Sequence, residues 1–169
     1  MANRPLEATR RSVVAPVTLG GLLMTACAGV PRPSDAGGWT VMEKANVTVV
    51  GDFLASIKPK DMTQLNKYLS PACVYRMTET SPPDKGYDAI AQRLRPFVDS
   101  ADRIEINILT TYAAGPIVIN HRVDKFTSSV HPLLFEGVGV FFLADGKIKE
   151  WTDYTIRAAL ANEWPPAKH

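Results

Sequence analysis

The stretch LLFEGVGVFFLADGKIKEWTDY, residues 133–154, contains two apolar runs separated by a short polar turn. The turn carries Asp145-Gly146, and this dipeptide between apolar runs favours a tight β-hairpin. The sequence therefore predicts two antiparallel strands, Leu133–Leu143 and Lys147–Tyr154, and this hairpin is the part of the chain from which the fold can be extended.

Two more strands are predicted upstream of the hairpin, at Ile104–Tyr112 and Ile117–Thr127, each bounded by turn residues. The first half of the chain instead has apolar residues at helical spacing, in three groups: Val47, Val50, Leu54 and Ile57; Met62, Leu65 and Leu69; Ile90, Leu94 and Phe97. Helices followed by an antiparallel meander predict an α+β domain, in which the helices cover one face of a curved sheet.

The limits of the helices follow from breaking and capping residues. Pro59 is expected to stop the first helix, and Asp61 followed by Gln64 forms a capping pair for the second. Pro96 lies late in the third helix and is expected to kink or end it.

Two short motifs lie in the predicted strands, Arg122-x-Asp124 and Trp151-x-Asp153. Residues two apart in a strand point to the same face, so each motif projects both side chains into one space. Each residue alone could be a core aromatic, a structural ion pair or a surface charge. Two carboxylates and one guanidinium among apolar residues are costly unless they pair, so together they predict a catalytic or ligand-binding pocket.

Further residues share the faces of these motifs. Tyr75 and Met77 lie on one face of a strand predicted at 72–79, and Asn120 has the same parity as Arg122. The apolar positions expected to line the pocket are Met77, Val118, Phe126 and alternate residues among 133–141. Such a pocket suits a neutral, lipophilic substrate.

The composition fits one globular domain and excludes several functions. The chain has 169 residues, 46% of them hydrophobic, and its formal charge of +2 comes from the N-terminus, because 16 basic and 16 acidic residues remain beyond residue 26. No basic run suggests a nucleic-acid surface. The sequence also shows no metal-ligand spacing, no glycine-rich phosphate loop and no serine nucleophile elbow, so neither a metal nor a cofactor is expected.

The N-terminus resembles a bacterial export signal. Arg10-Arg11 precede an apolar stretch at 13–26 that is too short to span a bilayer comfortably. Residues 9–14 resemble the twin-arginine motif, and Met24-Thr25-Ala26-Cys27 resembles a lipobox in which Cys27 would be acylated.

These features predict three parts: a signal at 1–27, a tether at 28–38 and a folded domain at 39–169. The protein is then expected in the cell envelope or periplasm, held to the membrane only through a lipid anchor. Cleavage after Ala28, or an unprocessed tail, would give the same domain without the anchor.

Over about residues 44–157, the chain resembles the limonene-epoxide hydrolase family. The resemblance rests on the order of the elements and on four features: Tyr75, Arg122-x-Asp124, the Asp145-Gly146 hairpin and Trp151-x-Asp153-Tyr154. This family belongs to the cone-shaped, nuclear-transport-factor-2-like (SnoaL-like) superfamily. The resemblance implies a curved mixed sheet with three to four helices on one face, commonly a homodimer packed through the sheet. It also implies one-step hydrolysis of a small lipophilic epoxide by water, without a cofactor.

The resemblance assigns roles to five residues. It makes Asp153 the base that takes a proton from water, Asp124 the acid that protonates the epoxide oxygen, and Arg122 the bridge between them. It implies that the Tyr75 hydroxyl helps to hold the attacking water. It also implies that Trp151 forms one wall of the site and that its indole N–H can donate to the acid carboxylate. Such a pair needs opposite protonation states, which interacting carboxyl groups favour.

One position departs from the family, because Met77 stands where the family has an asparagine that orients water. Asn120 is one hypothetical replacement, and Thr78 or Glu79 reaching inward through a bulge is another. The departure keeps two other functions open, a ketosteroid-isomerase-like acid/base enzyme and a non-catalytic binder of a lipophilic ligand.

Overall fold

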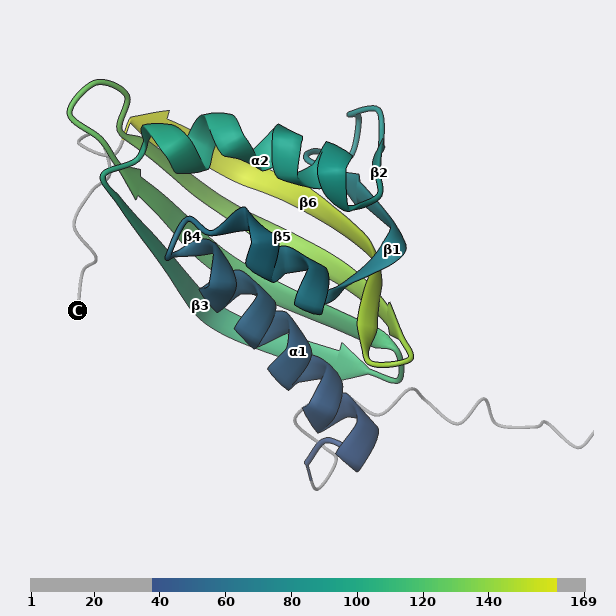
Figure 1. Cartoon of the computed structure of the whole chain (residues 1–169). Helices are drawn as coiled ribbons and strands as arrows, with labels where there is room; N and C mark the ends of the chain where they lie inside the picture. The colour runs from purple at the N-terminus through teal and green to yellow at the C-terminus, as the bar shows by residue number, and fades with distance from the viewer. Residues whose placement is uncertain (1–37, 161–169) are drawn as a thin grey trace, which may run out of the picture. The chain divides into compact units, whose positions relative to one another are not determined.

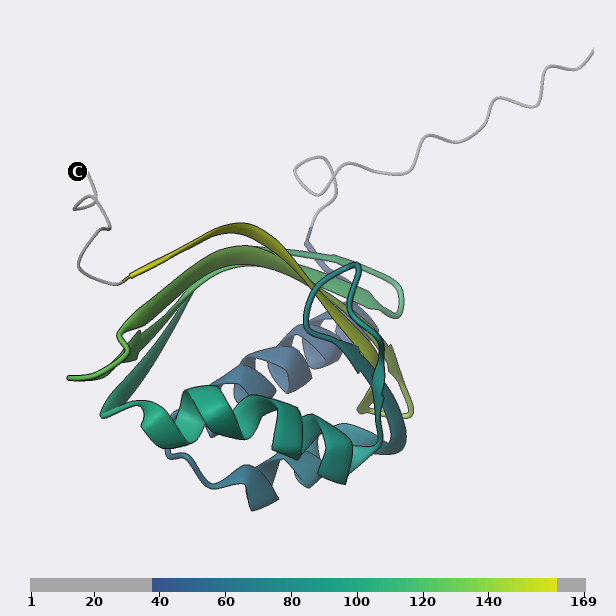
Figure 2. The same ribbon diagram turned by 90° about the horizontal axis from the view of Figure 1, so that it is seen from above.

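The computed structural model describes residues 38–160, which form a six-stranded sheet with two α-helices and one 3₁₀ helix. Figure 1 shows both α-helices in front of the sheet, and Figure 2, seen from above, shows the sheet curving around them. This is the α+β architecture that the sequence predicted, with helices on one face of a curved, mixed sheet. No helix among the described residues is long and apolar enough to cross a membrane.

Helix α1 (Val41–Ile57) begins with a capping box formed by Thr40 and Glu43, which was not predicted from the sequence. The Glu43 backbone N–H donates to the Thr40 hydroxyl, and the Thr40 N–H donates to the Glu43 carboxylate. The same carboxylate accepts from the Gly115 N–H at 2.9 Å, while Asn46 donates to the Gly115 carbonyl at 3.1 Å. The start of α1 is thereby fixed to one end of the sheet.

The second helical segment is shorter than predicted. The 3₁₀ helix η1 spans Met62–Lys67, with Asp61 accepting from the Thr63 N–H as its cap. The placement of Leu69 in this helix was wrong, because Leu69 begins strand β1 (Leu69–Arg76) and pairs with Ile148. The predicted strand 72–79 therefore starts and ends three residues earlier in the structure, at 69–76.

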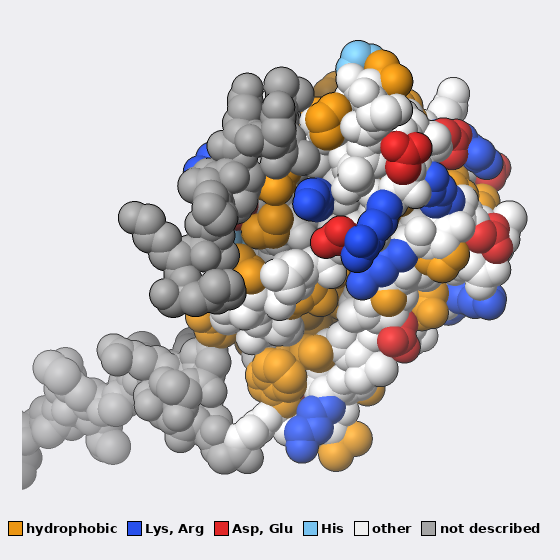
Figure 3. Space-filling model, turned by 90° about the vertical axis from the view of Figure 1, so that its left-hand side faces the viewer, with side chains coloured by type: hydrophobic (Ala, Val, Ile, Leu, Met, Phe, Trp, Pro, Cys, Tyr) orange, Lys and Arg blue, Asp and Glu red, His pale blue; other side chains and the backbone are white. Residues whose placement is uncertain are grey.

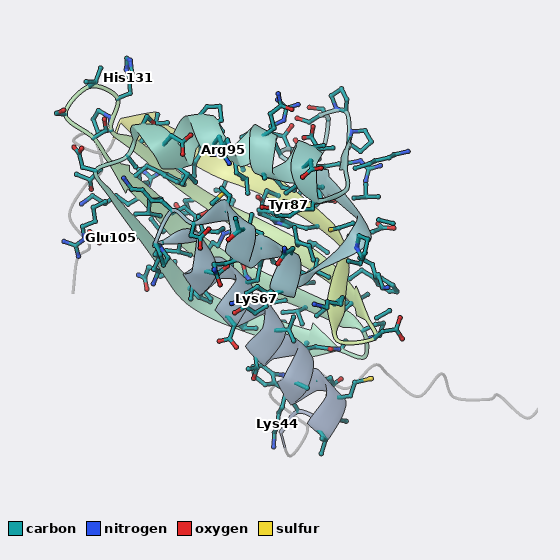
Figure 4. The ribbon with its side chains drawn as sticks, viewed as in Figure 1. Lys44, Lys67, Tyr87, Arg95, Glu105 and His131 are labelled. Atoms are coloured by element: carbon teal, nitrogen blue, oxygen red, sulfur yellow. The ribbon has the colours of Figure 1, made fainter. Side chains whose placement is uncertain are left out.

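Helix α2 (Tyr87–Ser100) continues for four residues beyond Pro96, so this proline does not end it. Proline removes a single backbone donor, whose acceptor four residues earlier belongs to Gln92 on the exposed side of the helix. At the other end the Tyr87 hydroxyl, labelled in Figure 4, donates to the Met62 carbonyl at 2.6 Å and joins α2 to η1.

The sheet has the order β2-β1-β6-β5-β4-β3, in which β1 runs parallel to β6 and the other neighbours are antiparallel. The remaining strands are β2 (Asp84–Lys85), β3 (Arg103–Ala114), β4 (Ile117–Thr127), β5 (Leu133–Ala144) and β6 (Lys147–Leu160). The predicted hairpin joins β5 to β6, and the positive φ of Asp145 (54°) and Gly146 (68°) is typical of its tight turn.

The core lies between the helices and the concave face of the sheet. Phe53 of α1 contacts the rings of Phe141 and Trp151 edge-on, and Trp151 stacks on both Phe141 and Tyr75. Edge-to-face and offset aromatic pairs add about 0.5–1.5 kcal/mol each beyond their burial. This cluster fixes Tyr75 and Trp151, the two aromatic residues that the sequence placed in the pocket.

Candidate active site

A cavity of about 210 Å³ opens on the concave face, between the sheet and helices α1 and α2. Its lining includes seven residues that the sequence predicted for the site: Tyr75, Met77, Arg122, Asp124, Phe126, Trp151 and Asp153. Strand alternation explains the grouping, since each motif on β4 and β6 presents two side chains to this face. Most of the other lining residues are apolar, as expected for a lipophilic ligand.

Arg122 is the one buried cation among residues 38–160, with an exposed fraction of 5%. By contrast, Lys44, Lys67, Arg95 and His131, all labelled in Figure 4, are exposed. The space-filling view in Figure 3 likewise shows basic and acidic side chains interspersed over one outer face. Burying a cation is costly unless hydrogen-bond acceptors or negative charges surround it.

The two aspartates supply acceptors on either side of the guanidinium. Arg122 Nε donates to Asp124 Oδ2 at 2.9 Å, and Arg122 Nη2 donates to Asp153 Oδ1 at 2.7 Å. Burial opposes the charge, but the two carboxylates raise the pKa of Arg122 above its ordinary value. The side chain is therefore a permanent cation that bridges two acidic groups on different strands.

The two aspartates differ in their remaining contacts. Asp153 Oδ1 also accepts from Trp151 Nε1 at 2.8 Å, and Asp153 Oδ2 accepts a longer bond of 3.3 Å from the Tyr75 hydroxyl. Asp124 Oδ1 is buried and has no hydrogen-bond partner among residues 38–160. Asp153 thus accepts three hydrogen bonds, whereas Asp124 accepts a single one.

The pKa of Asp124 is raised above its ordinary value, first because burial disfavours the carboxylate and also because Asp153 is negative, against the opposing charge of Arg122. Burial, and then the charge of Asp153, raise the pKa of Tyr75 well above its ordinary range, so its hydroxyl keeps its proton. The cavity therefore contains a carboxyl group inclined to hold a proton beside one with the contacts of a carboxylate.

Three sequence expectations need correction. Val118 is fully buried in the core and does not line the cavity, because its end of β4 lies towards the turn that α1 covers. Asn120 is also fully buried and contacts Arg122 instead of the cavity. The Trp151 indole donates to Asp153, its neighbour two residues along the strand, and not to Asp124 as expected.

Part of the cavity lining could not be predicted from the sequence. Leu94 and Phe97 were recognised as a helix face, but their place at the cavity was not, since it depends on how α2 lies across the sheet. Thr78, which was considered as an inward-reaching residue, does line the cavity, and its hydroxyl bonds that of Ser81 at 2.7 Å. Cys27 and the export signal lie outside the described residues.

Comparison with known proteins gives a family match over most of this domain. The model of the limonene-1,2-epoxide hydrolase catalytic domain matches residues 44–165. An LEH-like epoxide hydrolase from M. tuberculosis is 25% identical, with a TM-score of 0.58 over 67% of this chain and 84% of that one. No curated protein sequence gave a match.

Two further solved structures have the same fold at 14% identity. A putative SnoaL-like polyketide cyclase from Jannaschia sp. has a TM-score of 0.63 over 72% of this chain and 92% of its own. The epoxide hydrolase/cyclase-like enzyme SalBIII, described in pyran ring formation, has a TM-score of 0.63 over 70% and 97%. At this identity the similarity establishes the fold alone.

Proposed function

This chain belongs to the limonene-1,2-epoxide hydrolase family, and from that premise we propose that it adds water to a lipophilic cyclic epoxide, such as a terpene or sterol epoxide, to give a vicinal diol. The observation that carries the proposal is the Arg122 bridge between two unlike carboxyl groups in an apolar cavity. Epoxide opening by water needs one group to remove a proton and another to supply one, at the same time.

In this mechanism Asp153 is the base and Asp124 the acid. Asp153 Oδ1 is occupied by Arg122 and Trp151, so Oδ2, with its single long bond from Tyr75, is the oxygen that takes a proton from water. The water oxygen bonds to a ring carbon as that carbon's bond to the ring oxygen breaks. Asp124, whose pKa is raised by burial, delivers its proton to the ring oxygen.

The test is diol formation from a panel of cyclic, terpene and sterol epoxides with the full chain, followed by a single turnover in ¹⁸O-labelled water. Direct attack by water places one ¹⁸O in every diol of the first turnover. A first-turnover diol without the label would mean that an enzyme carboxylate attacked the ring, which contradicts the one-step mechanism.

The panel also separates the alternatives that Met77 keeps open. An isomerase of the ketosteroid type would leave epoxides intact and exchange carbon-bound hydrogen of a ketosteroid with solvent deuterium. A binder would retain a lipophilic ligand without converting it. Either result would overturn the hydrolase proposal.

A homodimer packed through the sheet is part of the same proposal. Strand alternation places Tyr112, Ile117 and Phe142 on the face opposite the helices, and all three are exposed, by 47%, 39% and 42%. We expect light scattering to give twice the mass of one chain and Phe142→Lys to reduce it to one. A single-chain mass for the unchanged protein would contradict the dimer.

A further inference from the structure

We infer that Asn120 and Gly139 are positioning residues, which hold the Arg122 guanidinium in the one orientation that bridges Asp124 and Asp153. The effect of these two residues on catalysis rests on the proposed acid–base function, whereas their contacts with Arg122 do not depend on it. The three side-chain nitrogens of Arg122 each have their own acceptor: Nε bonds Asp124, Nη2 bonds Asp153, and Nη1 bonds Asn120 Oδ1 at 3.1 Å.

Asn120 is poorly suited to its place on packing grounds alone. It is fully buried, and its Nδ2 has no hydrogen-bond partner in the described part of the chain. A leucine would fill a similar volume without a buried, unpaired donor. The cost of burying the amide is offset by its Oδ1, which accepts a hydrogen bond from Arg122 Nη1.

The neutral amide also suits the charges around it. A guanidinium carries one positive charge, and two carboxyl groups already face it. A carboxylate at position 120 would satisfy Nη1 equally well but would compete with both aspartates for the same cation. The Asn120 amide oxygen accepts from Arg122 Nη1 and so fixes the third nitrogen of the guanidinium without adding a charge.

Gly139 provides the space that this orientation needs. It pairs with Asn120 on one side and with Asp153 on the other. A Cβ at position 139 would overlap Arg122 Nη1 and lie 2.7 Å from Phe141 Cε2 and 3.1 Å from Asn120 Oδ1. Phe141 cannot move aside readily, because it is fully buried and stacked on Trp151.

Loss of this support is expected to loosen the bridge and raise the pKa of Asp124 further, because its carboxyl group loses part of its contact with the cation. The other titratable groups that line the cavity are Tyr75 on β1, Glu136 on β5 and Tyr154 on β6, whereas the lining residues of α1, α2 and β3 are apolar. Glu136 is hydrogen-bonded to His121 at 2.9 Å. The substitutions below leave Tyr75, Glu136 and Tyr154 unchanged.

The experiment titrates the Asp124 side-chain carboxyl by ¹³C NMR in the ligand-free protein, for wild type, Asn120→Leu, Asn120→Asp and Gly139→Ala. We expect this carboxyl to titrate at least about half a pH unit higher in Asn120→Leu and Gly139→Ala. Asn120→Asp keeps the acceptor and adds a charge, so it should also shift the Asp124 titration upward. A core variant away from the bridge, Leu143→Ala, should lower thermal stability without any shift.

Titrations of Asn120→Leu and Gly139→Ala that superimpose on wild type would overturn the inference, whatever the enzyme's activity. Activity is a second readout: because Asn120 does not line the cavity, Asn120→Leu should lower kcat at least about tenfold with little change in KM. If wild type opened no epoxide, the proposed function would fail, yet the carboxyl titrations would still decide the role of Asn120. Equal losses in Leu143→Ala and Asn120→Leu, without a titration shift, would reduce Asn120 to a packing role.

Discussion

Asp153→Asn is expected to lower kcat for epoxide hydrolysis about 1000-fold or more, which lies within the contribution that a positioned general base makes. Asparagine has the same size, and its Oδ1 can still accept from Arg122 and Trp151. The other oxygen, which receives the Tyr75 hydroxyl and would take the proton from water, becomes an NH₂ group that cannot accept it. Substrate binding should change little, so KM should stay near wild type, whereas loss of one charge beside the buried Arg122 should lower the melting temperature.

The measurement is kcat and KM for the best epoxide of the panel, with thermal unfolding of each variant. Asp145→Asn makes the same chemical change at an exposed carboxylate in the β5–β6 turn and should leave both constants unchanged. Hydrolysis by Asp153→Asn at the wild-type rate would show that another group activates water. If Asp153→Asn failed to fold, kcat and KM of Asp153→Ser would be compared with those of wild type.

Strand alternation accounts for what could be predicted about the site. The period of two fixes which residues share a face, so Arg122 and Asp124, or Trp151 and Asp153, could be paired without a structure. The distance between the two motifs could not be predicted, because strand β5 lies between β4 and β6 and its register is not visible in the sequence. The 2.7 Å bond from Arg122 to Asp153 spans that strand.

The same reasoning explains why Val118 and Asn120 were placed in the cavity. Parity gives the face of a strand but not which part of that face a helix covers. Contacts of α1 with the Gly115 turn close the β4 end that carries Val118, and Asn120 lies behind the Arg122 side chain. Gly139 gave no signal at all, since its importance comes from a side chain on the neighbouring strand.

The pairing of β1 with β6 was also beyond the sequence. Hairpins join strands that are close in the chain, whereas this parallel pair joins residues about 80 positions apart, such as Tyr75 and Trp151. The parallel register stacks these two rings and brings the Tyr75 hydroxyl to Asp153. The helix that was predicted to include Leu69 ended early because Leu69 is needed for this pairing.

Arg122→Met is expected to lower the free energy of unfolding by about 3–5 kcal/mol at neutral pH, the usual result of removing one partner of a buried ion pair. Methionine fills part of the space, but two carboxyl groups then face an apolar cavity with no cation between them. Hydrolysis should be lost as well, because no cation then bridges the two carboxyl groups and holds them in position. The loss of stability should also depend on pH, because Asp124 and Asp153 lose their negative charge as the pH falls.

Burial already raises the pKa of Asp124 in the presence of Arg122, and removal of the cation raises it further. A carboxyl whose pKa is higher in the folded state gives stability that is fully present below its unfolded pKa of about 3.9 and is lost as the pH rises through the folded pKa. The deficit of Arg122→Met relative to wild type should therefore be largest near neutral pH and become smaller as the pH falls towards 4.

Urea unfolding at pH 7 and at pH 4.5 measures this difference, with two variants as controls. Arg95→Met removes an exposed arginine paired with Asp99 and should stay within about 0.5 kcal/mol of wild type at both values of pH. Adding Asp124→Asn to Arg122→Met should recover part of the stability at pH 7, because it removes one of the two uncompensated charges. A deficit of equal size at both pH values, with no recovery in the double variant, would mean that Arg122 contributes through packing and not as the cation between two acids.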